Sequence, residues 1–303
     1  MSSWKGKTRG GLTGYRIFLF LLKSFSINAA YMLLYFVASY YVLFARKARK
    51  PMYYYFNTIL GFNPIKSFQY LYKNNLTFGK VIIDKVTVMA GLPNKFTFDF
   101  EGEEHLHSMA ENGGGLIISA HFGNWEIAGH LLDRIKTPVH IVMLEAEHEN
   151  IKALLDTVMT EKKMSIIPIK DDMSHLFKIK DALKNNEIVA LHGDRFLPGS
   201  KTITCNFLGK KAEFPTGPFY IALKYNKPVT YVSAVKETNT HYHLFSTPPM
   251  DYLADHGGNV RNLKDRDQKL KIMLSDYIKE LELLVRKHPE QWFNYYYFWN
   301  INN

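Results

Sequence analysis

Six consecutive residues, His121 to Glu126 (His-Phe-Gly-Asn-Trp-Glu), have the types and spacing that acid–base chemistry needs. They follow a glycine-led apolar run over 113–120, which predicts a turn and then a short buried strand. A histidine leaving the carboxyl end of such a strand lies where open α/β sheets bind their ligands. Gly123 and Asn124 are turn and helix-start residues, so Glu126 is expected in a first helical turn. Its carboxylate can then orient one imidazole nitrogen while the other deprotonates a hydroxyl.

His140 has the same spacing to a carboxylate, Glu145, and serves as a control within the chain. The stretch 138–145 is expected to form one strand, on which positions five apart point to opposite faces and cannot meet. With 12 histidines in the chain, such coincidences of spacing are expected. A hydrogen-bonded structural histidine is the alternative for His121 as well. The strand end, glycine turn and helix start around His121 favour the catalytic interpretation.

The elements that must position these residues alternate between strands and helices along the chain. Short apolar or alternating runs predict strands, and amphipathic stretches between them predict helices. Alternation at this spacing is typical of an α/β fold, with a mainly parallel central sheet flanked by helices. Residues 242–246 are expected to add an antiparallel edge, and 51–76 to be helical in pieces. The expected strands are 96–100, 116–120, 139–144, 165–168, 188–192 and 229–235, and the expected helices are 78–89, 149–162, 174–185, 217–226, 261–287 and one starting near 125.

Charge is unevenly distributed along the chain, whose formal net charge is +10. Residues 1–83 contain 12 Lys or Arg and no acidic residue, whereas the remainder balances 26 basic against 28 acidic side chains. The basic segment is also apolar, because the 18 residues from Ile27 to Phe44 carry no charge, just enough for a spanning helix. We therefore expect a basic, apolar membrane anchor at 1–50 and a domain at 51–303, whose first part, 51–95, is helical and close to the membrane.

Basic residues flank the apolar stretch on both sides, which predicts attraction to an anionic membrane surface. The same symmetry gives the positive-inside rule no clear direction. We expect an uncleaved anchor that spans the membrane or dips into its cytoplasmic leaflet. A cleavable signal peptide fits less well, because the apolar region is long and no small-residue cleavage site follows it. A buried aromatic helix of a soluble domain is the alternative.

Other classes of function find little support in the sequence. Nucleic-acid binding is not expected, because the basic residues flank an apolar stretch instead of lining a polar face with aromatics between them. The single cysteine, Cys205, excludes an internal disulfide. No metal site is expected: His105 with His107, and His241 with His243, were weighed as ligands on strands, but no carboxylate cluster joins them in the sequence. A Gly-x-Ser-x-Gly elbow is also absent.

Four blocks of the sequence, in order, resemble the lysophospholipid acyltransferase superfamily, and within it the bacterial late acyltransferases of lipid A biosynthesis, of the lauroyl/myristoyl transferase type. The resemblance implies a glycerol-3-phosphate acyltransferase-like fold and a His-x4-Glu dyad formed by His121 and Glu126. It also implies a place on the cytoplasmic face of the bacterial inner membrane. The blocks are His121 to Glu126, Gly193-Asp194-Arg195 with its loop, Phe214 to Pro218 with the following helix and strand, and His288 to Trp292.

The resemblance and the chemistry of these blocks together nominate substrate-binding residues. Arg195 can bind an anionic group through two parallel hydrogen bonds, although an Asp–Arg pair that braces the loop is an equal alternative. The start of the helix near residue 217 can offer backbone N–H groups to an anion. The sequence departs from the family in having no arginine after Gly217, and in an uncharged aromatic stretch, 293–299, after Trp292. The nominated substrate-binding residues are Asn124, Trp125, Asp194, Arg195, Thr216 and Gly217.

The sequence therefore predicts a membrane-associated enzyme that moves a fatty acyl group from a thioester to a lipid hydroxyl. His121 is expected to act as the general base and Glu126 to hold its imidazole, with no cofactor and no metal. Acyl carrier protein is the donor that the resemblance implies, with acyl-CoA as the other possibility. Two alternatives stay open: an ester or thioester hydrolase that uses the same dyad on water, and a catalytically idle membrane-bound lipid-binding protein. Both departures from the family predict an acceptor other than a phosphorylated lipid A precursor.

Overall fold

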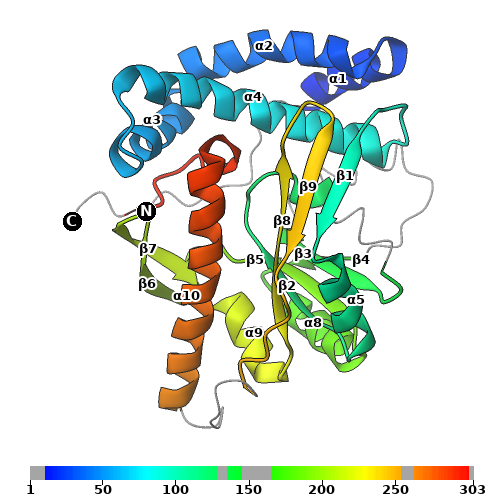
Figure 1. Ribbon diagram of the computed structural model, residues 1–303, viewed down its shortest axis with the longest axis vertical. Coiled ribbons are helices and arrows are strands. Elements are labelled where there is room, and N and C mark those ends of the chain that lie inside the picture. The colour runs from blue at the N-terminus through cyan, green and yellow to red at the C-terminus, as the bar shows by residue number, and fades with distance from the viewer. Residues whose placement is uncertain (1–10, 128–134, 145–164, 254–262, 300–303) are drawn as a thin grey trace.

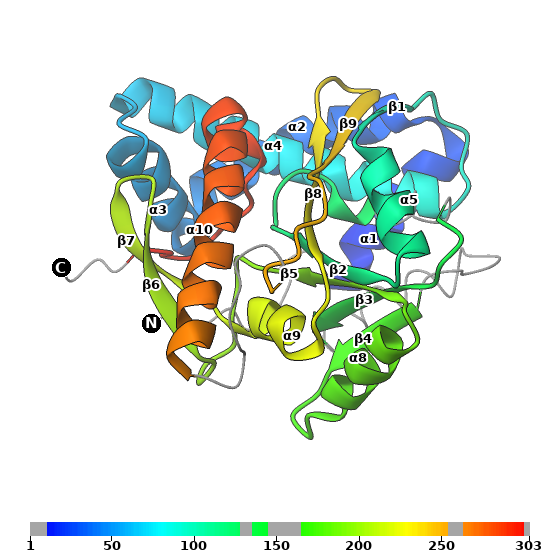
Figure 2. The ribbon, with the colours of Figure 1, turned by 60° about the horizontal axis from the view of Figure 1, so that its bottom comes forward.

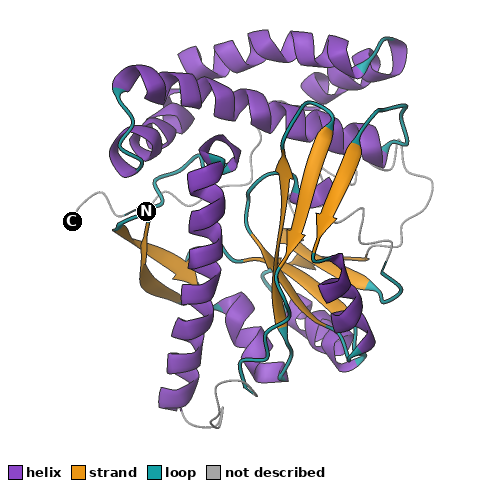
Figure 3. Cartoon of the chain, viewed as in Figure 1, coloured by secondary structure: helices purple, strands orange, loops and turns teal. Residues whose placement is uncertain are grey.

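A computed structural model describes residues 11–127, 135–144, 165–253 and 263–299. Its centre is a seven-stranded sheet with the order β1-β9-β8-β2-β5-β3-β4 (Figure 3). Strands β8, β2, β5, β3 and β4 run parallel, whereas β9 pairs antiparallel with β8 and parallel with β1. The strands are β1 (Thr97–Glu101), β2 (Gly115–Ser119), β3 (Val139–Leu144), β4 (Ser165–Ile169), β5 (Ile188–His192), β8 (Val229–Lys236) and β9 (His241–Ser246).

Among the described residues after 95, four α-helices and a hairpin surround this sheet (Figures 1 and 2). The longest helix, α10, lies between the sheet and the two-stranded hairpin, and its Tyr277 ring contacts Phe214 of the hairpin and Tyr231 of β8. Through these contacts, α10 joins the hairpin to the main sheet. The elements are α5 (Glu103–Glu111), α8 (Ser174–Lys184), α9 (Gly217–Tyr225), α10 (Leu263–Lys287) and the antiparallel strands β6 (Thr202–Phe207) and β7 (Lys210–Pro215).

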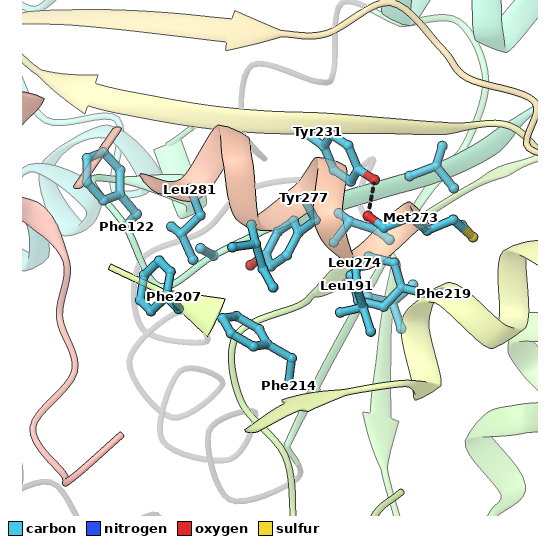
Figure 4. Close-up of a cluster of buried hydrophobic side chains, with 14 of the residues drawn as sticks. Phe122, Leu191, Phe207, Phe214, Phe219, Tyr231, Met273, Leu274, Tyr277 and Leu281 are labelled. Carbon is cyan, nitrogen blue, oxygen red and sulfur yellow. Dashed lines mark hydrogen bonds between the residues drawn. The ribbon is translucent and has the colours of Figure 1, made fainter. Parts of the chain in front are cut away.

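The main hydrophobic core fills the space between β2, β5, β8 and α10 (Figure 4). Phe122, Phe207 and Phe214 are almost completely buried there. The hydroxyl of Tyr231 donates to the carbonyl oxygen of Met273 at 3.0 Å, so this buried polar group has a partner. Phe122 belongs to this core, which therefore anchors the residue that directly follows His121.

A second layer, made by the amino-terminal helices, covers the end of the sheet where the parallel strands finish (Figure 1). Helix α4 lies between α2 and the sheet, and α2 packs on it through a stripe of Ala30, Tyr31, Leu34 and Ala38. The Asn63 side chain accepts a hydrogen bond from the N–H of Lys66 and caps α4, whose first residue is proline. The helices are α1 (Gly11–Ser24), α2 (Ile27–Phe44), α3 (Arg46–Tyr54), a π-helical turn (Tyr55–Ile59) and α4 (Pro64–Met89).

The expected elements and the observed ones agree closely in the sheet and less well elsewhere. Strands at 139–144 and 188–192 have the expected bounds, and the α/β class with a mainly parallel sheet is confirmed. The antiparallel strand β9 is not the edge, because β1 pairs with its outer side. The hairpin β6–β7 and helix α5 were not predicted. The expected helix at 149–162 and Glu145 lie outside the described residues, and residue 50, the expected end of the anchor, lies inside α3.

Candidate active site

His121 lies just beyond the carboxyl end of β2, and Asp194 lies just beyond the carboxyl end of the neighbouring strand β5. The two parallel strands end at the same level, with Ser119 opposite His192, so the residues that follow meet. The Asp194 carboxylate accepts two hydrogen bonds from His121, one from the backbone N–H at 2.9 Å and one involving Nδ1 at 2.8 Å. The predicted sheet edge therefore carries a histidine held by a carboxylate in two places.

The Asp194 carboxylate is buried, with its side chain 2% exposed, and it has a third donor in the indole N–H of Trp292 at 3.3 Å. Burial by itself raises the pKa of this carboxyl, but the adjacent His121 and the nearby Arg195 cation hold it below its usual value. Asp194 is therefore ionised at neutral pH. The expectation that Asp194 binds substrate is a different role from the one its contacts give it, which is to hold His121.

Glu126, the expected partner of His121, makes a different contact. Its carboxylate lies 2.5 Å from the ammonium of Lys85 on α4, and both side chains are mostly buried, at 17% and 11% exposure. A helix starts at residue 125, as expected, but it directs Glu126 toward the helical layer. The imidazole Nδ1 is instead occupied by Asp194, which reaches it from the next strand. Sequence spacing along one loop could not reveal a partner that the sheet supplies.

A second histidine, His192, lies directly beside His121, with ring centroids 4.2 Å apart. Its Nδ1 is 2.9 Å from the Ser119 hydroxyl, and the edge of the Trp125 ring system approaches it at 4.4 Å between centroids. Burial is the main cause that lowers the pKa of His192 well below its usual value, and the adjacent His121 lowers it further. The sequence analysis did not single out His192, although it ends a predicted strand two residues before Asp194.

The backbone of the His121 loop, residues 120–124, is fixed by the segment 291–293 near the end of the chain. The N–H of Phe293 donates to the carbonyl of His121 at 2.9 Å, and the N–H of Gly123 donates to the carbonyl of Gln291 at 2.9 Å. Gly123 has a φ of +60°, and a Cβ at this position would lie 1.9 Å from the carbonyl oxygen of Ala234. Only glycine fits this close approach. The first and last of the four sequence blocks thus pack against each other.

Two more of the expected substrate-binding residues lie beside the His121 loop. Asn124 is 1% exposed, and its side chain accepts from the N–H of Ile127 and donates to the carbonyl of Val81 and the hydroxyl of Tyr242. It acts as a helix cap and spacer, and its contact with a substrate stays a prediction that this burial does not favour. Trp125 packs against the ring of His192 and is within the site.

The remaining three expected residues make structural contacts with the backbone. The Nη2 of Arg195 donates to the carbonyl of Phe293 at 2.5 Å, a contact that differs from the Asp–Arg pair given as the alternative. Thr216 bonds through both its N–H and its hydroxyl to the carbonyl of Lys201, and Gly217 begins α9 as predicted. Substrate binding by Arg195, Thr216 and Gly217 stays a prediction.

The other histidines confirm that spacing alone does not identify a site. His140 pairs through Nε2 with Glu187 at 2.7 Å, across the sheet from β3. His105 and His107 lie on helix α5 and not on a strand as expected. His241 and His243 do lie on a strand, where carboxylates of Asp99, Glu101 and Glu237 come within 3.5–3.7 Å of their ring nitrogens, distances too long for hydrogen bonds.

Comparison with known proteins identifies the family of this chain. The model of the bacterial lipid A biosynthesis acyltransferase family matches residues 14–299. The chain belongs to this family. The crystal structure of the 1-acyl-sn-glycerophosphate (LPA) acyltransferase PlsC from Thermotoga maritima is similar, with 15% sequence identity, a TM-score of 0.38, and coverage of 83% of this chain and 94% of that chain. No curated protein sequence matches this chain.

In this acyltransferase, one group of described residues has the composition of a metal site. Ligand atoms of His121, His192 and Asp194 all lie within 4.8 Å of one another. In the observed arrangement, however, each has other partners: Asp194 accepts N–H groups of His121 and Trp292, and His192 faces Ser119. In these hydrogen bonds the Asp194 carboxylate and the Nδ1 atoms of both histidines already have protein partners.

Proposed function

We propose that this acyltransferase moves a fatty acyl group from a thioester donor to the hydroxyl of a membrane lipid, with His121 as the general base. The observation that carries the proposal is the His121 imidazole held by a buried carboxylate at the carboxyl ends of β2 and β5. Ligands of open α/β sheets bind at this edge. A base with an orienting acid is the arrangement that hydroxyl activation requires.

In the proposed reaction, the Nδ1–H of His121 donates to Asp194, which leaves the lone pair of Nε2 for the acceptor hydroxyl. Nε2 takes the hydroxyl proton as the oxygen attacks the thioester carbonyl. The carbon–sulfur bond then breaks, and the imidazolium returns the proton to the departing thiolate, so the products are an ester and a free thiol. Asp194 stays ionised and stabilises the imidazolium. Such base catalysis contributes about 10²–10⁴-fold to the rate.

The donor is proposed to be an acylated acyl carrier protein, which the family membership supports, with acyl-CoA as the other donor to be tested. The acceptor is where this chain departs from its family's usual pattern. No arginine follows Gly217, so a cation that would bind a phosphate is missing there. Within the aromatic stretch after Trp292, Phe298 and Trp299 cannot contact the acceptor, because they are core residues at 7% and 3% exposure. We retain the prediction that a phosphorylated lipid A precursor is not the best acceptor.

The amino-terminal helices are proposed to hold the enzyme on the cytoplasmic face of the inner membrane. Among the described residues, α2 alone is long and apolar enough to cross a membrane, and 22% of it is buried. Its buried stripe packs on α4, which also carries Lys66 and Lys80. A helix bound along its length to such a partner fits a place within one leaflet better than a span. The exposed apolar side chains include Ile17, Phe20, Phe25, Met32, Phe36, Tyr40 and Phe44.

One experiment tests the donor, the acceptor and the location together. Purified protein is mixed with anionic phospholipid vesicles that contain either a phosphorylated lipid A precursor or a neutral hydroxylated lipid. The donor is a labelled fatty acyl group carried either by acyl carrier protein or by CoA. Flotation then separates bound from free protein, and the label is followed into lipid. We expect the protein to float and the neutral acceptor to be labelled faster. A clear preference for the phosphorylated sugar would refute the acceptor prediction. Release of free fatty acid alone would indicate a hydrolase, and no turnover would indicate a lipid-binding protein.

A further inference from the structure

Helix α4 contacts the His121 loop and the start of the helix that follows it through two separate sets of buried polar contacts. The first is the Lys85–Glu126 ion pair, in which the ammonium and carboxylate lie 2.5 Å apart. Removing one partner of an ion pair this buried is destabilising, because the other charge then stays buried without a counter-charge. Glu126 is the fifth residue after His121, so the pair fixes the start of the helix that ends the loop.

The second set of contacts runs through Asn124. Its amide nitrogen donates to the carbonyl of Val81 on α4 at 3.3 Å and to the hydroxyl of Tyr242 at 3.2 Å. The Tyr242 hydroxyl in turn donates to the carboxylate of Asp84, which is completely buried. Val81, Asp84 and Lys85 lie within about one turn of α4, so a single stretch of this helix holds both Asn124 and Glu126.

The same stretch of α4 also contacts helix α2, which carries several of the exposed apolar side chains. The hydroxyl of Tyr31, on the buried face of α2, donates to the other oxygen of Asp84. Lys236, at the end of β8, adds its ammonium to this carboxylate at 2.5 Å. Asp84 thus joins α2, α4 and the sheet at one point. The position of the His121 loop is fixed relative to the helices that carry the exposed apolar face.

We propose that Lys85 and Glu126 are positioning residues that fix the His121 loop against α4. Glu126 acts through its ion pair with Lys85 and not on the His121 imidazole. The inference rests on the proposed function, in which His121 is the base. Displacing a catalytic group by about 1 Å can cost about 100-fold in rate. The Lys85–Glu126 ion pair also fixes the distance of the His121 imidazole from the exposed apolar side chains of α1 and α2, so that a hydroxyl of a membrane lipid can reach it.

The test compares four variants of the full-length protein. Lys85→Met and Glu126→Gln each remove one charge, the double variant Lys85→Glu/Glu126→Lys reverses the pair, and Lys73→Met is the matched control. Lys73 is on the same helix and pairs with Glu290 at 3.6 Å, but its side chain is 56% exposed, so its loss should be almost silent. Two readings are taken: kcat and KM for acyl transfer, and hydrogen exchange of residues 120–127 without substrate.

We expect each single variant to lower kcat by about tenfold or more with little change in KM, and to speed hydrogen exchange of the loop. The reversed pair should recover most of both. Normal exchange and normal kcat in Lys85→Met would overturn the proposal. So would a reversed pair as inactive as Glu126→Gln with a well-protected loop, because that result would put Glu126 on the imidazole.

A variant that fails to fold, and a failure of the proposed acyl transfer, can each be distinguished from a failure of the proposal for Lys85 and Glu126. If a single variant does not fold, the apolar pair Lys85→Met/Glu126→Leu replaces both charges, and the proposal then requires faster exchange of the loop in a protein whose other helices stay protected. If no acceptor is acylated by the wild type, the proposed function fails. The hydrogen-exchange comparison still decides whether α4 holds the loop.

Discussion

Strand β5 has a histidine–carboxylate pair at each end, and the two pairs have nearly the same hydrogen-bond length, through Nδ1 of one histidine and Nε2 of the other. At its carboxyl end, His121 pairs with Asp194 at 2.8 Å. At its amino end, His140 pairs with Glu187 at 2.7 Å. The histidines are also similarly exposed, at 15% and 17% of their side-chain areas. Neither the residue types nor the hydrogen-bond length distinguishes a catalytic pair from a structural one here.

The surroundings of the two carboxylates differ. Asp194 is 2% exposed and accepts three N–H donors, one of them from the backbone of the histidine that it orients. Glu187 is 22% exposed, and its contact with His140 is a side-chain pair alone. A carboxylate fixed in several directions holds an imidazole in one tautomer and one orientation. The comparison therefore favours the carboxyl end of β5, where the strands also stop at the same level, as the place of the proposed chemistry.

The largest difference between the two ends of β5 should appear when each histidine is replaced by alanine. His121→Ala should lower acyl transfer by at least about 100-fold with the fold intact, because the variant lacks the base itself. His140→Ala should be almost silent in kcat, whatever it costs in stability. The rates are measured with saturating donor in the vesicle assay, and far-ultraviolet circular dichroism monitors the fold. Near-normal turnover of His121→Ala would show that the base lies elsewhere.

Replacing the two carboxylates should also affect the two ends of β5 differently, but by a smaller amount. Asp194→Asn keeps the size of the side chain but presents an amide, which cannot stabilise an imidazolium and can reverse the tautomer of His121. We expect kcat to fall by about tenfold or more, less than for His121→Ala, while KM changes little. Glu187→Gln, the matched change at the other end of β5, should leave kcat within about twofold of the wild type. Equal losses in the two variants would mean that Asp194 contributes only stability.

The sequence predicted what local patterns encode and missed what the sheet brings together. The apolar run before His121 and the turn at Gly123 placed the histidine correctly at a strand end. The same reasoning put Asp194 on that edge, but the register that aligns Ser119 with His192 is a property of pairing between strands far apart in the chain. Lys85 precedes its partner by some forty residues, and no spacing rule connects them. The family resemblance, carried by four blocks in order, was confirmed over residues 14–299.

The exposed elements were harder still to predict. The hairpin β6–β7 was missed because its strands carry lysines, polar residues and a proline, and their stability comes from the aromatic contacts of Phe207 and Phe214 with the end of the chain. Helix α5 was missed because its two histidines suggested a strand, although the burial of Leu106 and Met109, three apart, is helical. In both cases tertiary contacts outweighed the local signal.

The smallest effect concerns the pH dependence of stability and arises at the carboxyl end of β5. His192, at the carboxyl end, is enclosed between the rings of His121 and Trp125, and burial depresses its pKa well below the ordinary value of 6.5. The unfolded chain therefore binds a proton near pH 6.5 that the folded protein does not, so stability falls as the pH decreases below that value. For one proton the slope is at most about 1.4 kcal/mol per pH unit.

Replacing His192 by Asn keeps a polar partner for Ser119 without a group that titrates in this range, so it should flatten the decline in stability between pH 7 and pH 5. The free energy of unfolding is measured in urea at both values, in detergent, for the wild type and the variant. His107→Asn removes an imidazole that is 42% exposed, serves as the matched control and should keep the wild-type slope. If the wild type and His192→Asn lose stability in parallel, the enclosed ring is not the group that senses pH. The acid sensitivity of the fold would then have to come from other groups, among them His175 and His288, whose pKa values burial also lowers.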